Sequence, residues 1–141
     1  MDFHNGPGIA HLALHTKDII KAVSTMRAAK VEFIDVPSTY YDMWKEKEGF
    51  HSVKENWDDL EKLEILVDGN AHKTQENEKS SEFKYLLQTF TLPLQDRPTF
   101  YLEIISRKRA NGFGKGNITH LFLAIERLQQ RRGTLGFDKK I

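Results

Sequence analysis

The sequence predicts an α+β fold with the element order βαβββ followed by a C-terminal helix. Strand-length runs rich in β-branched and aromatic residues occur at 9–14, 83–91 and 100–105. Apolar residues recur at helical spacing after the first run and again near the end of the chain. A chain of 141 residues has the size of one domain, so we expect residues 1–141 to form a single unit.

The first strand and the first helix follow from the pattern of residues near the N-terminus. In the run 9–14, His11 shares one face with His15, at the end of the run, because side chains alternate along a strand. Thr16 or Asp18 is placed to cap a helix that extends to about residue 29. Four apolar residues give this helix its buried stripe: Ile19, Ile20, Val23 and Met26.

The middle of the chain mixes short helices and strands. Four elements are expected there: a strand at 31–36, a helix at 38–47, a short helix within 53–63 and a strand at 63–67. Residues 70–82 are charged and rich in Ser and Asn, with almost nothing to bury, and predict a flexible loop.

The last part of the chain carries the most hydrophobic strands. In the strand at 83–91, Gln88 faces the same way as Leu86 and Phe90. In the strand at 100–105, the carboxylate of Glu103 shares a face with Tyr101 and Ile105. Three further segments complete the chain: a turn at 93–98, a glycine loop at 112–117 and an amphipathic helix at 118–132. The termini at 1–7 and 134–141 are expected to fray.

Composition excludes several functional classes. A formal net charge of +1 gives no reason to expect nucleic acid or a membrane surface as a partner. The chain has no cysteine, which excludes disulfides, thiolate metal sites and cysteine nucleophiles and is consistent with a cytoplasmic location. We see no apolar run of the roughly 18 residues that a bilayer requires, and no targeting segment at the N-terminus.

The strongest chemical candidates are one carboxylate and one imidazole on separate strands. A charge at Glu103, within so hydrophobic a strand, is costly to bury unless it is paired or bound to a metal. A non-heme ferrous site uses two imidazoles and one carboxylate on one face, and His11 with Glu103 would supply part of such a set. The glycine loop lacks the glycine that a dinucleotide-binding GxGxxG motif needs at position 117, where Asn117 stands.

Seven collinear segments resemble the C-terminal part of the 4-hydroxyphenylpyruvate dioxygenase family. They are GIAHLALHT at 8–16, FIDVPSTYYD at 33–42, KEN at 54–56, EILVD at 64–68, LLQTFT at 86–91, QDRPTFYLEII at 95–105 and GFGKGN at 112–117. The resemblance extends from about residue 6 to residue 133. It implies a vicinal-oxygen-chelate fold, of the glyoxalase and dihydroxybiphenyl-dioxygenase type, as a βαβββ half-barrel with a C-terminal helix.

The resemblance also implies a function and a set of site residues. That family uses Fe(II) and O₂ to convert 4-hydroxyphenylpyruvate to homogentisate and CO₂ in tyrosine and phenylalanine catabolism. By position, His11 is similar to the family's second iron-ligating histidine and Glu103 to its carboxylate ligand. Gln88 matches a glutamine on the substrate side of the family's barrel. Phe113 in the glycine loop matches an aromatic residue that closes the pocket over the substrate ring, and Asn117 belongs to the same loop.

Several residues depart from the family pattern. Tyr101 stands where the family has Phe, and Ala10 where it has Gln before the histidine ligand. Ile118 replaces a Phe of the pocket wall, a feature that resembles the related hydroxymandelate synthases. The family's first iron histidine belongs to a preceding βαβββ module, so the third ligand must come from outside this module.

Three readings follow from the incomplete ligand set. The chain is a catalytic module of a dioxygenase, with a homogentisate or a hydroxymandelate product. Alternatively, two copies form a homodimer that closes a barrel around one metal, as in glyoxalase-type metal lyases. The third reading is a non-catalytic module that kept the fold and lost the site.

Overall fold

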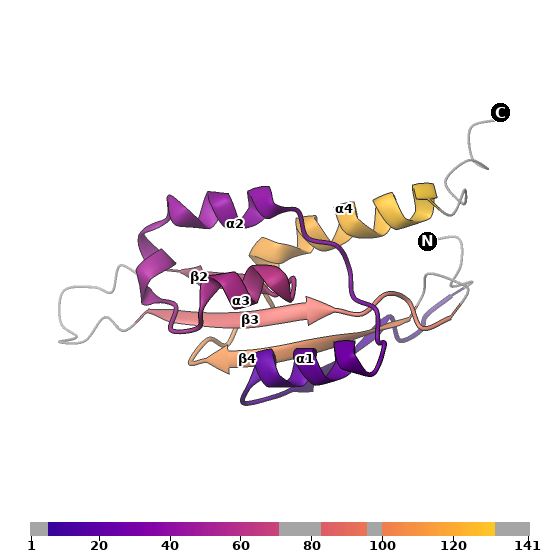
Figure 1. Cartoon of the computed structure of the whole chain (residues 1–141). Helices are drawn as coiled ribbons and strands as arrows, with labels where there is room; N and C mark the ends of the chain where they lie inside the picture. Colours follow the sequence, from indigo (N-terminus) through magenta and orange to yellow (C-terminus); the bar gives the residue numbers. More distant parts are fainter. Residues whose placement is uncertain (1–5, 71–82, 96–99, 132–141) are drawn as a thin grey trace.

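A four-stranded mixed sheet forms the centre of the computed structural model (Figure 1). The structure describes residues 6–70, 83–95 and 100–131. Its elements are β1 (His11–His15), α1 (Ile19–Ala28), α2 (Ser38–Lys45), a 3₁₀ turn (Glu48–Ser52), α3 (Trp57–Lys62), β2 (Leu66–Asn70), β3 (Lys84–Phe90), β4 (Tyr101–Lys108) and α4 (Lys115–Arg131). The strand order is β1-β4-β3-β2. The first strand pairs in parallel with the last, and the other pairs are antiparallel.

This order confirms the predicted α+β class and the βαβββ succession, but the expected strand at 31–36 is wrong. Only Phe33 makes a bridge there, to Thr91. The segment is an extended connection whose apolar side chains Phe33, Ile34 and Val36 are buried in the core. A buried connection and a strand have the same composition, which explains the error.

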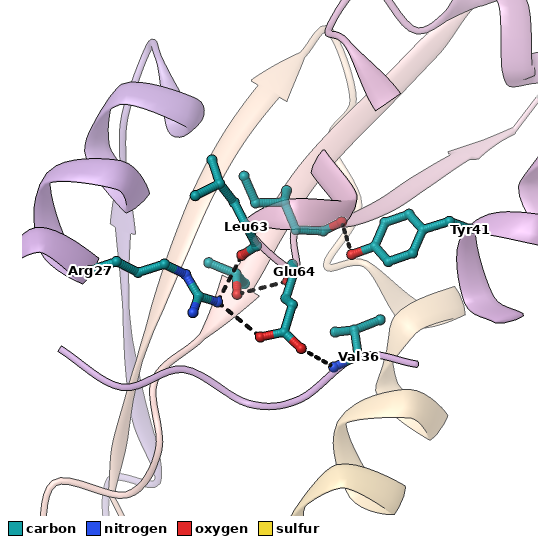
Figure 2. A network of polar contacts seen from close by, with 7 residues as sticks. Arg27, Val36, Tyr41, Leu63 and Glu64 are labelled. Atoms are coloured by element: carbon teal, nitrogen blue, oxygen red, sulfur yellow. Dashed lines mark hydrogen bonds and ion pairs between the residues drawn. The ribbon is translucent and has the colours of Figure 1, made fainter. Parts of the chain in front are cut away.

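A polar network holds this connection in place (Figure 2). The Glu64 carboxylate accepts hydrogen bonds from the Val36 backbone N–H at 3.0 Å and from Arg27 of α1 at 3.1 Å. The same Arg27 guanidinium donates to the Leu63 carbonyl at 2.9 Å. Beside it, the Tyr41 hydroxyl donates to the Ile65 carbonyl at 2.9 Å. A side chain therefore satisfies the Val36 N–H that a neighbouring strand would otherwise bind.

Element boundaries follow from local capping. Asp18 caps α1 by accepting from the Lys21 N–H, as expected. At the end of α3, Glu64 adopts a left-handed φ of 57°, so β2 begins at Leu66 rather than at residue 63 and continues to Asn70. The final helix begins three residues earlier than predicted, because the Asn117 N–H donates to the Gly114 carbonyl.

The two faces of the sheet have different surroundings. Helix α1 packs against β4, and its buried Ile19 and Val23 join a core that includes Leu87 and Ile104. On the other face, α4 packs against β2. Its start is close enough for the Gly116 N–H to donate to Asp68 at 3.4 Å. The second face is the one that carries His11 and Glu103.

Some predictions lie wholly or partly outside the described residues. These are the loop at 70–82 beyond Asn70, most of the turn at 93–98 and both outer termini. The single-domain assignment of 1–141 stays a prediction. Among the helices that the structure describes, none has the length and apolar character to cross a membrane.

Candidate metal centre and substrate cavity

A cavity of about 470 Å³ lies on the face of the sheet opposite α1. Side chains that point the same way from three adjacent strands form its floor, and the loop and helix after β4 form its rim. The floor residues are His11, Ala13, Gln88, Phe90, Tyr101, Glu103, Ile105 and Arg107, and the rim residues are Phe113, Ile118 and Phe122. Six of the seven predicted site residues therefore meet around one cavity.

The parallel pairing of β1 with β4 brings the two predicted metal ligands together. In this register His11 lies opposite Tyr101, and Ala13 lies opposite Glu103. Because Ala13 is small, the imidazole can reach the carboxylate diagonally, and His11 Nε2 lies 3.3 Å from Glu103 Oε2. Two metal ligands at right angles with bonds of roughly 2.1 Å lie about 3 Å apart, so the separation of these two atoms is compatible with both binding one metal.

Burial dominates the electrostatics of Glu103. The residue is 6% exposed, and this desolvation raises the pKa of its carboxyl group. The charge of His11, that of Arg107 and the His11 hydrogen bond act in the opposite direction. The His11 ring stacks on Tyr101 with centroids 5.1 Å apart and an interplanar angle of 6°, which fixes the plane of the imidazole. Burial and the nearby Glu103 charge raise the pKa of the Tyr101 phenol.

The opposite side of the cavity presents an unpaired amide. Gln88 on β3 is fully buried, and neither its Nε2 nor its Oε1 has a hydrogen-bond partner among the described residues. Gly114, with a φ of +71°, lies directly against this amide, and a Cβ at that position would collide with it. A buried amide without partners is costly, so a polar group of a ligand would satisfy it.

The rim is apolar and open. Phe113 is 85% exposed, and the side chains of Ile118 and Phe122 are exposed beside it. Large apolar side chains exposed around a cavity are typical of a surface that binds a ligand or another protein chain.

Asn117 is the one predicted site residue that does not line the cavity. It is buried at the start of α4, where its Oδ1 lies 2.8 Å from the Tyr40 hydroxyl of α2. Its Nδ2 has no partner among the described residues. In this position, Asn117 fastens the helix that carries the rim.

The sequence pattern did not identify Arg107, Phe90 and Phe122 as cavity residues. For Phe90 and Arg107 the signal was available, since Phe90 shares the strand face of Gln88, and Arg107 that of Glu103. For Phe122 the sequence carries no such signal, because the position of α4 over the sheet depends on tertiary packing.

The donors fit part of a ferrous site. The His11 imidazole and the Glu103 carboxylate, whose nearest atoms lie 3.3 Å apart, provide two ligands of the two-histidine, one-carboxylate set. Within the described part of the chain, no third His, Asp, Glu or Cys is placed to join them. The His120 ring, for example, packs edge-on against the Tyr40 ring, with the ring centroids 4.8 Å apart.

Curated relatives match nearly all of the chain. It is 46% identical over 140 residues to a 4-hydroxyphenylpyruvate dioxygenase of Caenorhabditis elegans, covering 98% of this chain and 33% of the relative. It is 50% identical over 138 residues to the enzyme of that name from Neurospora crassa, covering 94% and 31%. No protein-family model matches.

Solved structures agree on the fold. A triple mutant of 4-hydroxymandelate synthase from Streptomyces coelicolor superposes with a TM-score of 0.71 and 34% identity, covering 91% of this chain and 32% of that one. The chain is a relative of the 4-hydroxyphenylpyruvate dioxygenases. It has the vicinal-oxygen-chelate fold of these dioxygenases and of hydroxymandelate synthase. It spans about a third of the length of the dioxygenases that it matches.

Proposed function

We propose that this chain is the catalytic module of an Fe(II)-dependent 4-hydroxyphenylpyruvate dioxygenase. The reaction would convert 4-hydroxyphenylpyruvate and O₂ to homogentisate and CO₂, a step of tyrosine and phenylalanine catabolism. One observation carries the proposal: His11 and Glu103 meet at 3.3 Å in a largely apolar cavity whose floor also bears the unpaired Gln88 amide. Curated relatives named 4-hydroxyphenylpyruvate dioxygenase support it.

Two residues of the chain would hold the metal. His11 would bind through Nε2, and its stack on Tyr101 orients the ring. Glu103 would bind as the carboxylate, and its negative charge would offset part of the charge of the metal. When bound, Fe(II) supplies the Lewis acidity and electron transfer that oxidative decarboxylation of a 2-oxo acid requires.

The remaining cavity residues suit an aromatic 2-oxo acid. Phe90 on the floor and Phe113 and Phe122 on the rim offer aromatic surface to a phenyl ring and exclude water from the reacting groups. Gln88 can both donate and accept a hydrogen bond, which suits a polar group of the substrate.

The third metal ligand is proposed to come from a second βαβββ module, whether that module is joined to this one in a longer protein, belongs to another chain or is a second copy of this one. Two observations support this. The described residues supply two donors, one fewer than the two-histidine, one-carboxylate set needs, and the relatives are about three times as long as this chain. The edge strand β1 is exposed along its whole length, so its outer backbone groups are available to such a partner.

Turnover by the assembled enzyme tests the proposal. The chain is combined with its partner module, loaded anaerobically with Fe(II), and given 4-hydroxyphenylpyruvate and O₂, and the products are identified by mass spectrometry. Homogentisate with stoichiometric CO₂ is the expected result. Bound metal without oxidation would favour the lyase-type homodimer, and absence of metal after reconstitution would favour a non-catalytic module.

A hydroxymandelate product is the second candidate, because Ile118 lines the cavity where the dioxygenases would place a larger aromatic wall. The superposition on a hydroxymandelate synthase is consistent with it. If Ile118 directs the outcome, Ile118→Phe in the active assembly should raise homogentisate relative to hydroxymandelate severalfold. Leu123→Phe, at an exposed α4 position away from the cavity lining, is the matched control. An unchanged product ratio would remove Ile118 from this role.

A further inference from the structure

Arg107 is a cationic residue in an otherwise largely apolar cavity. It lies on β4 four residues after Glu103, so both side chains point to the same face of the sheet. The residue is half-buried and lines the cavity. None of the roles described above uses its guanidinium.

The Arg107 guanidinium closes the turn that follows β4. Its Nη1 donates to the Ala110 carbonyl at 3.2 Å and to the Gly112 carbonyl at 2.5 Å. Hydrogen bonds from a charged donor are stronger than those between neutral groups, and Arg holds its donors in a rigid plane. The backbone immediately before Phe113 is therefore fixed by a side chain from the floor of the cavity.

The backbone immediately after Phe113 is fixed as well. Gly114 packs against the buried Gln88 amide in a left-handed conformation that leaves no room for a Cβ. Its carbonyl then accepts the hydrogen bond from the Asn117 N–H in the first turn of α4. Between these two fixed points, the Phe113 ring itself is 85% exposed on the rim.

We propose that Arg107 is a positioning residue: by binding the carbonyls that precede Phe113, it holds the Phe113 ring in place over the cavity, ready for an aromatic ligand. This inference rests on the proposed function, because the ligand of the ring is the aromatic substrate. Arg107 acts through Phe113 and does not itself contact that substrate.

Backbone dynamics of the full chain test the first half of the inference without any activity. ¹⁵N order parameters are measured for residues 111–114 in the native chain, in Arg107→Met and in Arg107→Lys. Values near about 0.85 in the native chain should fall below about 0.6 in Arg107→Met. Arg107→Lys keeps the charge but lacks the planar fork, so its values should also fall. Lys115→Met removes an exposed charge from the neighbouring position and should leave them unchanged.

Native-like order in Arg107→Met, or in Arg107→Lys should the Met variant fail to fold, would overturn the inference. Native-like order in Arg107→Met would mean that the loop stays ordered without the Arg107 hydrogen bonds. Native-like order in Arg107→Lys would mean that a positive charge alone is enough to order the loop.

A double-mutant cycle in the Fe(II)-loaded assembly tests the second half. Arg107→Met should raise KM for 4-hydroxyphenylpyruvate roughly tenfold, with kcat changed much less, since the loss is one of ring positioning. If Arg107 acts through Phe113, the Arg107→Met/Phe113→Ala double variant should be no worse than Phe113→Ala alone. Additive losses would overturn the inference, because they place Arg107 in direct contact with substrate. If the native assembly does not turn over 4-hydroxyphenylpyruvate, that result would instead count against the proposed function. The order parameters would then remain as the test of whether Arg107 fixes the loop before Phe113.

Discussion

Glu103 is a buried carboxylate with an imidazole beside it. Burying its negative charge costs free energy when no cation is bound, and the same arrangement is well suited to binding a cation. The residue is 6% exposed, and a buried charge is costly unless it is paired or bound to a cation. Metal binding requires a deprotonated carboxylate and a neutral imidazole, so a divalent cation would replace the proton that burial favours. The same local features therefore predict both metal affinity and a pH-dependent stability.

Removing either ligand should abolish metal binding. His11→Ala and Glu103→Ala each remove one of the three ligands proposed for the assembled site and leave a single donor on this chain, so we expect a loss of at least 100-fold in Fe(II) affinity for the assembled protein. His15→Ala is the matched control, because His15 shares the strand and the face but lies about 13 Å along β1. Anaerobic Fe(II) titration measures the effect. Native-like iron content in either ligand variant would refute the assignment.

In the metal-free chain, Glu103→Gln should change how stability depends on pH. Burial raises the folded-state pKa of Glu103, so its contribution to stability is fully present at low pH and is lost as pH rises through that pKa. At neutral pH, Glu103→Gln should therefore be more stable than the native chain, by on the order of 1 kcal/mol.

Urea unfolding between pH 4 and pH 8 in the presence of a chelator measures this difference, with Glu48→Gln as a control for loss of an exposed carboxylate. The advantage of Glu103→Gln should disappear at the acidic end. If the variant is instead less stable at neutral pH, then attraction from His11 and Arg107 outweighs the cost of burial.

At the scale of elements, Tyr40 joins α2, β2 and α4. Its hydroxyl accepts the Val67 N–H at 2.8 Å and lies 2.8 Å from both the Val67 carbonyl and Asn117 Oδ1, to one of which it can donate. Because β2 is an edge strand, its outer backbone groups need partners, and Tyr40 supplies one. The helix that carries Ile118 and Phe122 is anchored at this point.

Tyr40→Phe should destabilise the protein by about 1–3 kcal/mol, because it leaves the Val67 backbone and the Asn117 amide buried with fewer partners. Tyr41→Phe is the matched control: it removes a single hydrogen bond, to Ile65, and should cost about 0.5–1.5 kcal/mol. Urea unfolding of both variants gives the comparison. Equal losses would mean that Tyr40 has no special role in fastening α4.

Strand faces were predictable from sequence, and the pairing of strands was not. Alternation alone placed Glu103 with Tyr101, and Gln88 with Phe90, as the register confirms. The buried connection at 31–36 has the apolar content of a buried strand, so the sequence predicts a strand there. Its hydrogen-bond partners, such as Glu64, are distant in sequence and cannot be inferred from the segment itself. Alternation also places Arg107 on the face of Glu103, but its hydrogen bonds to the loop at 110–112 depend on the path of that loop and cannot be predicted from the sequence.

For the whole molecule, the decisive feature is the parallel pairing of the first strand with the last. It brings His11 within 3.3 Å of Glu103 although the two residues lie far apart in the chain. The sequence predicted this meeting through a family resemblance rather than through a physical rule, since strand order depends on tertiary packing. The same order leaves β1 at an open edge and the cavity rim exposed.

The exposed rim should make the isolated chain associate with another βαβββ module. Phe113 and Phe122 are exposed beside an incomplete ligand set, and a partner that covers them would both bury apolar surface and supply the missing donor. Sedimentation at increasing concentration should show the mass rise from 16.4 kDa toward twice that value, or toward a hetero-complex when the N-terminal module of a relative is added. Phe122→Glu should prevent association, whereas Leu94→Glu, an equally exposed position outside the cavity, should not. A chain that stays monomeric at every concentration and takes up no added module would contradict the shared-site proposal, and Fe(II) binding by that monomer would show that its ligands are complete without a partner.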